Sequence, residues 1–370
     1  MQLRPVKNRR AATGRAAGLI DGRSQGLEHG YHLGRCEAVR AIVPPAPITL
    51  RQLRVLYIPQ GFPAIDQGVI KALGSLVSEL VVGTPPEMLT AAAQMRPDLM
   101  LVLNGLHVFP ENHLQQIDTV RAMGIRTAIW FADDPYFTDD TIRIAQHYDV
   151  VLTHEQSCVQ LYKENGCANV AYLPLAADTD VFRPQQVGLN YRSDVCFIGM
   201  AFWNRVAVFD RIAPYLSGKK VVIAGGLWNR MKNYKLLRHS IREGWTPVEE
   251  TAKYYSGAKI VINLHRGHVQ EIDNRNSRSV PGQSINPRTY EMAGCGSMQL
   301  TDIRDDLARL YTPGREIAVY RSPEELMGQI EYYLSHDQER RAIAYNGLKR
   351  TLQQHTYVRR VEHLLQLLGY

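Results

Sequence analysis

Short apolar runs alternate with amphipathic segments from residue 53 to the end of the chain. The runs at 53–58, 79–82, 98–104, 126–131, 150–153 and 170–173 predict strands, as do those at 194–198, 220–224, 258–264, 298–300 and 316–319. Helices are expected between them, including 66–77, 86–95, 112–123, 234–243, 246–255, 323–335, 338–354 and 356–368. This alternation is typical of parallel sheets covered by helices. Because 370 residues exceed one ordinary core, we expect an α/β fold of two Rossmann-like, doubly wound domains.

Residues 1–50 stand outside this pattern. Glycines recur every four residues from Gly14 to Gly34, and prolines follow at 44, 45 and 47, so we expect a helix or helical hairpin over about 11–42 that docks on another surface. The segment has eight Lys or Arg against three acids. Such an arm suits an acidic partner, a membrane surface, pairing of two copies, or plain solvent exposure.

The charge of the whole chain narrows the class of protein. The net charge is +7, and the arm supplies most of it, so the nearly neutral remainder argues against a nucleic-acid binder. No run approaches the roughly 20 apolar residues of a membrane helix, and no secretory leader is visible, so a cytoplasmic protein is expected. Five cysteines without a C-x-x-C pair indicate neither disulfides nor a zinc site.

The segment 284–296 carries the clearest chemistry. Asn286 can cap a short helix that has Pro287 in its first turn, and an apolar strand follows. A helix start before a parallel strand favours a phosphate or diphosphate. Arg288 adds a full charge, and Glu291, one turn deeper, can accept hydrogen bonds from ribose hydroxyls. An ordinary capped helix with Glu291 in solvent accounts for the segment equally well.

Other candidates follow predicted strands, where the loops of doubly wound folds bind ligands. His107 lies in one such loop, and Asp133 and Asp134 lie in another, where they can orient a hydroxyl, act as a base or cap the next helix. Gly199 permits close approach of a ligand and Arg205 can reach a phosphate. The polar run 268–283 predicts a mobile surface loop. The D-x-D triplet at 178–180 is interpreted as part of an inter-domain connection, not as a metal site.

Several segments resemble glycosyltransferases of the two-Rossmann-domain (GT-B) architecture. They are LPLAADTDVFRP at 173–184, YSGAKIVIN at 255–263 and YEMAGCG at 290–296. A narrower resemblance is to the spore-maturation, CgeB-like glycosyltransferases. It rests on WFADDP at 130–135, FIG at 197–199 with NR at 204–205, INLH at 262–265, NPRTYE at 286–291 and HTY at 355–357.

The resemblance implies hexosyl transfer from a nucleotide diphosphate sugar, UDP- or dTDP-linked, to a glycan, lipid-linked or protein acceptor during sporulation or envelope synthesis. It implies a cytoplasmic or spore-associated enzyme that uses no metal or other cofactor. The binding candidates are Gly199, Arg205, Arg266, Asn286, Arg288, Tyr290 and Glu291, and the catalytic candidates are His107, Asp133 and Asp134. Gln283 stands where many retaining relatives carry a second Glu, so retention and inversion both stay open.

The resemblance also implies a division of the chain. We expect a basic helical arm at 1–50, an acceptor domain at 51–185, a nucleotide-sugar domain at 186–354, and a last helix at 355–370 that crosses back to the acceptor domain. Two other classes of function stay open, since fold does not fix activity. They are a sugar-nucleotide epimerase or hydrolase on the same fold, and a protein that binds a sugar nucleotide without turnover.

Overall fold

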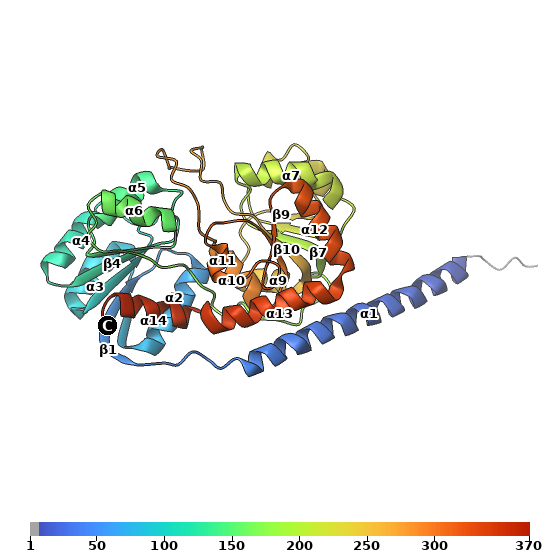
Figure 1. Ribbon diagram of the computed structural model, residues 1–370, viewed down its shortest axis with the longest axis horizontal. Helices are drawn as coiled ribbons and strands as arrows, with labels where there is room; N and C mark the ends of the chain where they lie inside the picture. Colours follow the sequence, from blue (N-terminus) through green and yellow to red (C-terminus); the bar gives the residue numbers. More distant parts are fainter. Residues whose placement is uncertain (1–6) are drawn as a thin grey trace, which may run out of the picture.

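The computed structural model describes residues 7–370, with side chains described for 18–20 and from residue 22 onward. Two lobes stand side by side, each built around a six-stranded parallel sheet (Figure 1). This confirms the predicted α/β fold of two Rossmann-like units. The first six residues of the predicted arm lie outside the described part.

The N-terminal lobe has the strand order β2-β1-β3-β4-β5-β6. Its strands are almost continuously apolar because helices cover both faces of the sheet. The strands are β1 (Arg51–Ile58), β2 (Val77–Val82), β3 (Leu99–Leu103), β4 (Arg126–Phe131), β5 (Val150–Thr153) and β6 (Val170–Tyr172). The helices are α2 (Pro63–Leu76), a 3₁₀ turn (Pro85–Glu87), α3 (Met88–Met95), α4 (His113–Ala122), α5 (Thr138–Ala145) and α6 (Gln156–Glu164).

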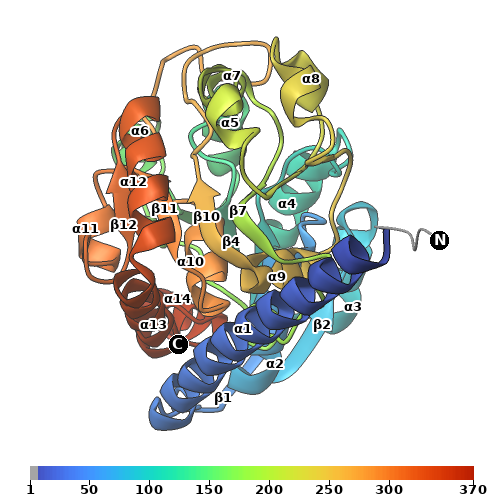
Figure 2. The same cartoon turned by 90° about the vertical axis from the view of Figure 1, so that its right-hand side faces the viewer.

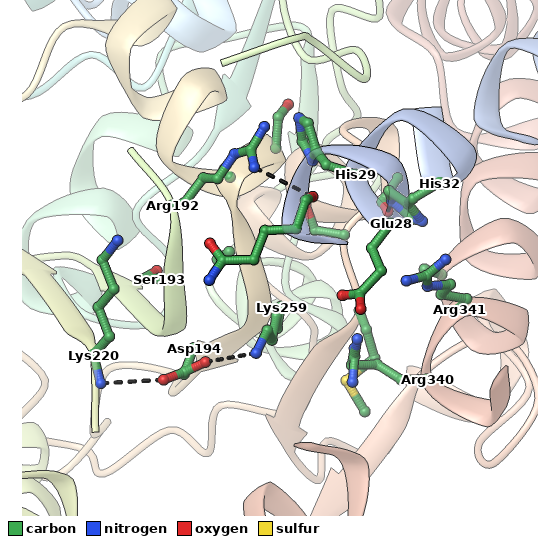
Figure 3. A pocket seen from close by; sticks show the side chains of 18 residues that line it. Glu28, His29, His32, Arg192, Ser193, Asp194, Lys220, Lys259, Arg340 and Arg341 are labelled. Atoms are coloured by element: carbon green, nitrogen blue, oxygen red, sulfur yellow. Dashed lines mark hydrogen bonds and ion pairs between the residues drawn. The ribbon is translucent and has the colours of Figure 1, made fainter. Parts of the chain in front are cut away.

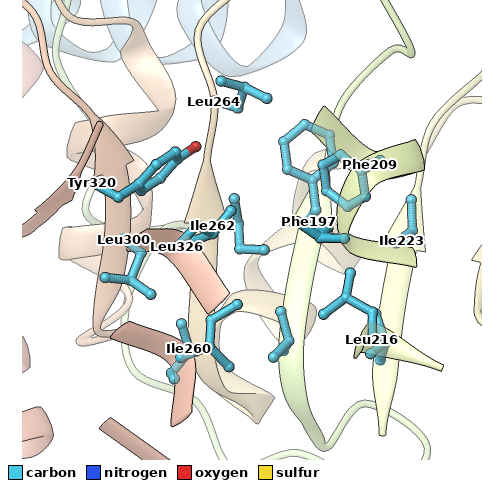
Figure 4. Close-up of a cluster of buried hydrophobic side chains, with 14 of the residues drawn as sticks. Phe197, Phe209, Leu216, Ile223, Ile260, Ile262, Leu264, Leu300, Tyr320 and Leu326 are labelled. Atoms are coloured by element: carbon cyan, nitrogen blue, oxygen red, sulfur yellow. The ribbon is translucent and has the colours of Figure 1, made fainter. Parts of the chain in front are cut away.

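The C-terminal lobe repeats this plan with the order β12-β11-β10-β7-β8-β9. Its strands are β7 (Ser193–Ile198), β8 (Val221–Ala224), β9 (Ile241–Arg242), β10 (Ala258–Asn263), β11 (Gln299–Asp302) and β12 (Ala318–Tyr320). Its helices are α7 (Trp203–Leu216), a 3₁₀ turn (Trp228–Arg230), α8 (Tyr234–Leu237), α9 (Val248–Gly257), α10 (Pro287–Gly294), α11 (Leu307–Leu310), α12 (Pro323–Ser335) and α13 (Asp337–Gln354). On one face of the sheet, Phe197 and Ile262 pack with Phe209 of α7 and Leu326 of α12 (Figure 4).

The last helix, α14 (Tyr357–Leu367), packs on α2 of the N-terminal lobe, after α13 has run along the C-terminal lobe (Figure 1). A Cβ added to Gly68 of α2 would lie 2.1 Å from the Tyr357 ring, so only glycine admits this contact. Ala177 bonds the turn before α14, donating to the His355 carbonyl at 3.0 Å and accepting from the Tyr357 amide at 3.2 Å. Two chain crossings, at about 177 and about 355, therefore join the lobes.

The N-terminal helix α1 (Lys7–Ile42) is one long helix and not a hairpin. Its C-terminal part lies along the C-terminal lobe and its other end projects beyond it (Figures 1 and 2). The His32 ring stacks on Tyr345 of α13 with the centroids 5.2 Å apart, and Cys36 is fully buried near Gly296. The helix thus docks on α13, as the sequence predicted for this segment.

The structure corrects two local predictions. The expected helix 234–243 ends at Leu237, and Ile241–Arg242 forms the edge strand β9. Ile241 is buried there, and backbone hydrogen bonds to β8 replace those of a longer helix. Helix α7 was not predicted, although its buried positions Val206, Phe209 and Leu216 follow helical spacing.

The domain boundaries at 50, 185 and 354 stay a proposal, and they agree with the positions of the two sheets. In the described part of the chain, no helix is both long enough and apolar enough to cross a membrane.

Candidate active site

A cavity of about 360 Å³ lies between the two lobes, where the carboxyl ends of both sheets meet. Its N-lobe wall includes Phe62, Asp133 and Tyr136. Its C-lobe wall includes Gly199, Phe202, Arg205, Trp245, Arg266, Asn286, Arg288 and Glu291. Ligands of doubly wound sheets bind at this edge, so this cleft is the candidate active site.

The start of α10 is held in place by a buried network. The Asn286 side chain caps the helix by accepting from the Thr289 amide at 3.1 Å, as the sequence predicted. The Asn286 amide group also donates to the Asn263 Oδ1 atom at 2.9 Å. The backbone N–H of Asn286 donates to Nε2 of His265 at 3.0 Å, while Nδ1 of His265 donates to Asp302 at 2.6 Å. Burial lowers the pKa of His265, which favours the neutral ring that this pattern requires.

Arg288 and Glu291 both line the cleft from α10. Among the described residues, neither side chain has a hydrogen bond or an ion pair within the chain. Burial raises the pKa of Glu291 to about 7, and the nearby Arg288 charge partly offsets that effect. A guanidinium and a carboxylate that both lack protein partners suit a ligand with an anionic group and hydroxyl donors. The alternative of a solvent-facing Glu291 is wrong, since its exposed fraction is 7%.

Arg205 and Arg266 add positive charge but are engaged by the protein. Arg205 donates to the carbonyls of Leu264 at 2.9 Å and Met200 at 3.0 Å. Burial, followed by the charge of Arg288, lowers the pKa of Arg205 to about 9. Arg266 donates to Asn274 and to the carbonyl of Asp273. Its guanidinium lies 4.2 Å from the ring centroid of Phe202 and 4.6 Å from that of Tyr136, so it contacts aromatic rings of both lobes.

Gly199 lies where two loops come into contact. A Cβ at Gly199 would lie 3.0 Å from Nη1 of Arg205, and a Cβ at Gly225 would lie 2.1 Å from the Gly199 carbonyl oxygen. Gly225 therefore needs glycine for the backbone to pass, whereas a side chain at Gly199 would press on the Arg205 guanidinium.

Asp133 is fixed on the opposite wall by Asn104. The Asn104 side chain accepts from the amides of Ala132 and Asp133 at 3.0 Å each, and donates to Oδ2 of Asp133 at 2.8 Å. Asn104 is fully buried with a φ of 64°, a left-handed conformation that non-glycine residues seldom adopt. Nε2 of His107 lies 3.8 Å from Oδ2 of Asp133. His107 and Asp133 therefore lie together, although His107 is not part of the cavity wall.

Asp134 and Tyr290 lie elsewhere, which corrects their inclusion as site candidates. Asp134 is fully buried in the N-terminal lobe and accepts from Thr153 at 2.6 Å, Tyr162 at 2.8 Å and Thr141 at 3.2 Å. Burial raises the pKa of Asp134 to about 6. The two acids lie in the bend and turn after β4, and of the two only Asp133 lines the cleft.

Tyr290 is also fully buried, with its ring in a cluster with those of Tyr311 and His355. The other proposed role for the acid pair, a helix cap, is not fulfilled either. Helix α5 begins after Phe137 without a side-chain cap.

Two features of the cleft were not predicted. Trp245 lines the cleft from the loop before α9, with 76% of its surface exposed.

The loop 268–283, predicted to be mobile, is hydrogen-bonded to the N-terminal lobe. The Arg275 amide donates to the Tyr136 carbonyl at 2.8 Å, Thr138 donates to Asn276 at 2.7 Å, and Val280 packs in the N-lobe core. In the sequence, the Gly-Trp-Thr-Pro turn could have indicated the exposed Trp245, and the two asparagines at 274 and 276 could have indicated an ordered loop.

The chain is similar to known proteins in sequence and in fold. Residues 205–366, which include the C-lobe wall from Arg205 to Glu291, match the family described as Glycosyl transferase-like. The spore protein CgeB of Bacillus subtilis (strain 168) is 27% identical over 314 residues, covering 82% of this chain and 95% of that protein.

Solved structures resemble the fold at low identity. Sucrose-phosphate synthase from Thermosynechococcus elongatus has a TM-score of 0.59 at 12% identity, covering 85% of this chain and 98% of its own. HepE of Anabaena, in complex with UDP and glucose, has a TM-score of 0.59 at 10% identity, covering 86% and 100%. The solved structures confirm the expected GT-B fold of two facing Rossmann-like lobes, and the sequence comparisons show that this chain is similar to CgeB and to glycosyl transferase-like proteins.

Proposed function

We propose that the cleft binds a UDP- or dTDP-linked hexose and transfers the hexosyl group to an acceptor that enters from the N-terminal lobe. The observation that carries this proposal is the pair Arg288 and Glu291, which face the cleft from a rigid helix start without partners among the described residues. HepE, of similar fold, is described with UDP and glucose bound, which supports a donor of this class.

The parts of a nucleotide sugar match the groups on the C-lobe wall. The diphosphate would lie at the amino end of α10 near Arg288, within the positive field of Arg205 and Arg266. Glu291 would accept hydrogen bonds from the ribose hydroxyls. Trp245 offers an exposed aromatic face on which a base can stack. Gly199, in the loop after β7, has no side chain and so leaves room for the nucleotide sugar to approach that loop closely.

The reaction needs positive charge at the leaving diphosphate. Arginines that are already fixed in place stabilise such charge without reorganisation during the reaction. Arg288 is free to move onto the phosphates, and Arg205 is held in place by two carbonyls. We therefore propose that transfer needs no divalent metal. The acceptor hydroxyl would face Asp133, with His107 beside it.

Similarity to CgeB supports a role at the spore surface, with a glycan, lipid-linked or protein acceptor. The function is tested by incubating the protein with UDP-, dTDP- and GDP-hexoses, with and without candidate acceptors and with EDTA. Release of nucleoside diphosphate that depends on the acceptor and persists in EDTA is expected. Acceptor-independent release would favour the hydrolase alternative. Binding without any turnover would favour a non-catalytic protein.

Donor affinity is expected to depend on the protonation of Glu291. The pKa of Glu291 in the free protein is about 7, and ribose hydroxyls that donate to the carboxylate would lower it in the complex. Binding therefore favours the ionised form, so affinity is full above pH 8 and falls as the pH drops through 7. The dissociation constant of UDP-glucose should rise about tenfold from pH 8 to pH 6.

Calorimetric titration of UDP-glucose measures this dependence, because its diphosphate has no group that titrates near neutral pH. In Glu291→Gln the affinity should be lower at pH 8 and nearly independent of pH. A pH dependence that is unchanged in Glu291→Gln would assign it to another group.

We further propose that α1 pairs two copies of the chain. Leu19, Ile20, Leu27 and Tyr31 are between 61% and 69% exposed on this helix, and nothing lies within 4 Å of a Cβ built at Gly18, Gly22, Gly26 or Gly30. The glycines lie on one side of the helix and Ile20, Leu27 and Tyr31 on another, and these exposed apolar side chains can contact a second helix.

A further inference from the structure

A second cavity, of about 290 Å³, lies between α1 and the C-terminal lobe (Figure 3). Its lobe side is formed by the amino ends of the parallel strands, with Ser193 at the start of β7, Lys220 just before β8 and Ala258 at the start of β10. The active-site cleft lies at the carboxyl ends of these strands. The two cavities are therefore on opposite edges of the same sheet, and this one forms no part of the site already described.

Three polar atoms on the wall of this cavity are buried without a hydrogen-bond partner among the described residues. They are Oγ of Ser193, Nε of Arg192 and Nε2 of His29. Ser193 as a whole is 5% exposed. In Figure 3, Arg192 and Ser193 of the lobe face His29 of α1 across the cavity. A buried polar atom without a partner destabilises the fold, so three of them at one cavity indicate a place for a polar ligand.

The charges around the cavity indicate the sign of that ligand. Lys259 is paired with Asp194 at 2.9 Å, and Arg340 and Arg341 are both paired with Asp337. In the part of the chain with described side chains, the cationic groups of Arg192 and Lys220 have no carboxylate partner. Each donates to one carbonyl, Arg192 Nη1 to that of Gln25 and Lys220 Nζ to that of Leu189, both at 3.3 Å. Glu28 is the one remaining acid on the wall, and its side chain is exposed.

The pKa of His29 also reflects the positive charge around this cavity. Its pKa is lowered by burial and then by the positive charges of Arg192 and Arg341. A neutral imidazole can donate one hydrogen bond to an oxyanion, alongside the Arg192 guanidinium and the Ser193 hydroxyl.

We propose that this cavity is a binding site for a small oxyanion, a phosphate or carboxylate group of a metabolite, held by Arg192, Ser193 and Lys220 from the lobe and by His29 from α1. Charge-assisted hydrogen bonds from a fixed guanidinium are the strongest available contacts for such a group. Because the ligand touches both α1 and the lobe, its binding would hold the helix on the lobe. This inference does not depend on the proposed donor or acceptor.

The test is a calorimetric titration of the full chain with inorganic phosphate, glucose 6-phosphate and citrate in separate arms. Saturable binding of at least one of them is expected, and the arm that binds identifies phosphate, phosphate ester or carboxylate as the preferred group. Arg192→Gln should raise the dissociation constant about tenfold or more, since it removes a charged donor. Ser193→Ala, which keeps the charge and the fold of the wall, should weaken binding by a smaller factor.

Two control variants test whether the anion binds at this cavity and not at another positive surface. Arg211→Gln removes an equally positive but exposed side chain elsewhere on the lobe and should leave binding unchanged. Arg288→Gln alters the active-site cleft and should also leave it unchanged. The proposal is overturned if none of the three anions binds the wild-type chain, if Arg192→Gln and Arg211→Gln bind equally, or if Arg288→Gln alone abolishes binding.

Discussion

Replacing Arg288 by glutamine is expected to lower the rate of sugar transfer by about 10²–10³-fold, the usual loss when one donor to the charge of a transition state is removed. Charge develops on the diphosphate as the bond to the sugar breaks. Arg288 is the guanidinium of the cleft without a hydrogen bond or ion pair among the described residues, whereas Arg205 and Arg266 already donate to protein atoms. Arg205 and Arg266 therefore contribute positive electrostatic potential to the cleft, but they cannot replace the direct contact of Arg288 with the diphosphate.

Steady-state kinetics with a saturating acceptor measure this effect, and Arg288→Lys should recover part of the rate because it keeps a point charge without the fork. Arg321→Gln is the matched control, since Arg321 is 70% exposed and pairs only with Glu325. A rate within about twofold of wild type for Arg288→Gln would show that the leaving group is stabilised elsewhere.

Helices and strands could be predicted from the sequence where the burial of a short segment alone determines its bounds. The runs at 126–131 and 150–153 are buried strands with the predicted bounds, because a strand covered on both faces must be apolar throughout. The cap at Asn286 was also predictable, since it involves residues three apart. Predictions of this kind need no knowledge of what lies across the molecule.

The arrangement of the site needed contacts between distant parts of the chain. That Asp133 and not Asp134 faces the cleft depends on Asn104, which lies 29 residues before Asp133 and binds it but not Asp134. The loop 268–283 is polar in sequence because its asparagines form buried hydrogen bonds: Asn276 donates to the His268 carbonyl within the loop and accepts from the Thr138 hydroxyl of the other lobe. No local pattern distinguishes such buried polar residues from those of a solvated loop.

Trp245 is the opposite case, an aromatic residue that is exposed where the sequence pattern favours burial. A tryptophan in a short turn is usually part of a core, yet here it stays 76% exposed beside the cleft. Trp245 lies on the loop between the edge strand β9 and α9, and β9 was itself predicted as helix. With this element predicted as helix, Trp245 was not recognised as a candidate contact for the nucleobase of the donor.

Replacing Asp133 by asparagine is expected to reduce transfer by about 10²–10⁴-fold, the range for loss of a general base, with little change in donor affinity. Asp133 is on the wall opposite Arg288 and Glu291, so it would meet the acceptor hydroxyl rather than the nucleotide. The amide of asparagine preserves the size of the side chain but cannot take the proton. Turnover and donor dissociation constant are both measured, because only a separate effect on turnover distinguishes a base from a binding residue.

Asp118→Asn is the matched control in the same lobe, since the Asp118 side chain is 51% exposed and contacts only the surface residue His147. Asn104→Ala should act in the same direction as Asp133→Asn but less strongly, because it leaves the carboxylate present and removes only the contacts that orient it. Unchanged turnover in Asp133→Asn would remove this acid from the mechanism and leave His107 as the candidate base on that wall. A retained anomeric configuration in the product, combined with a small effect, would instead indicate that no base is needed there.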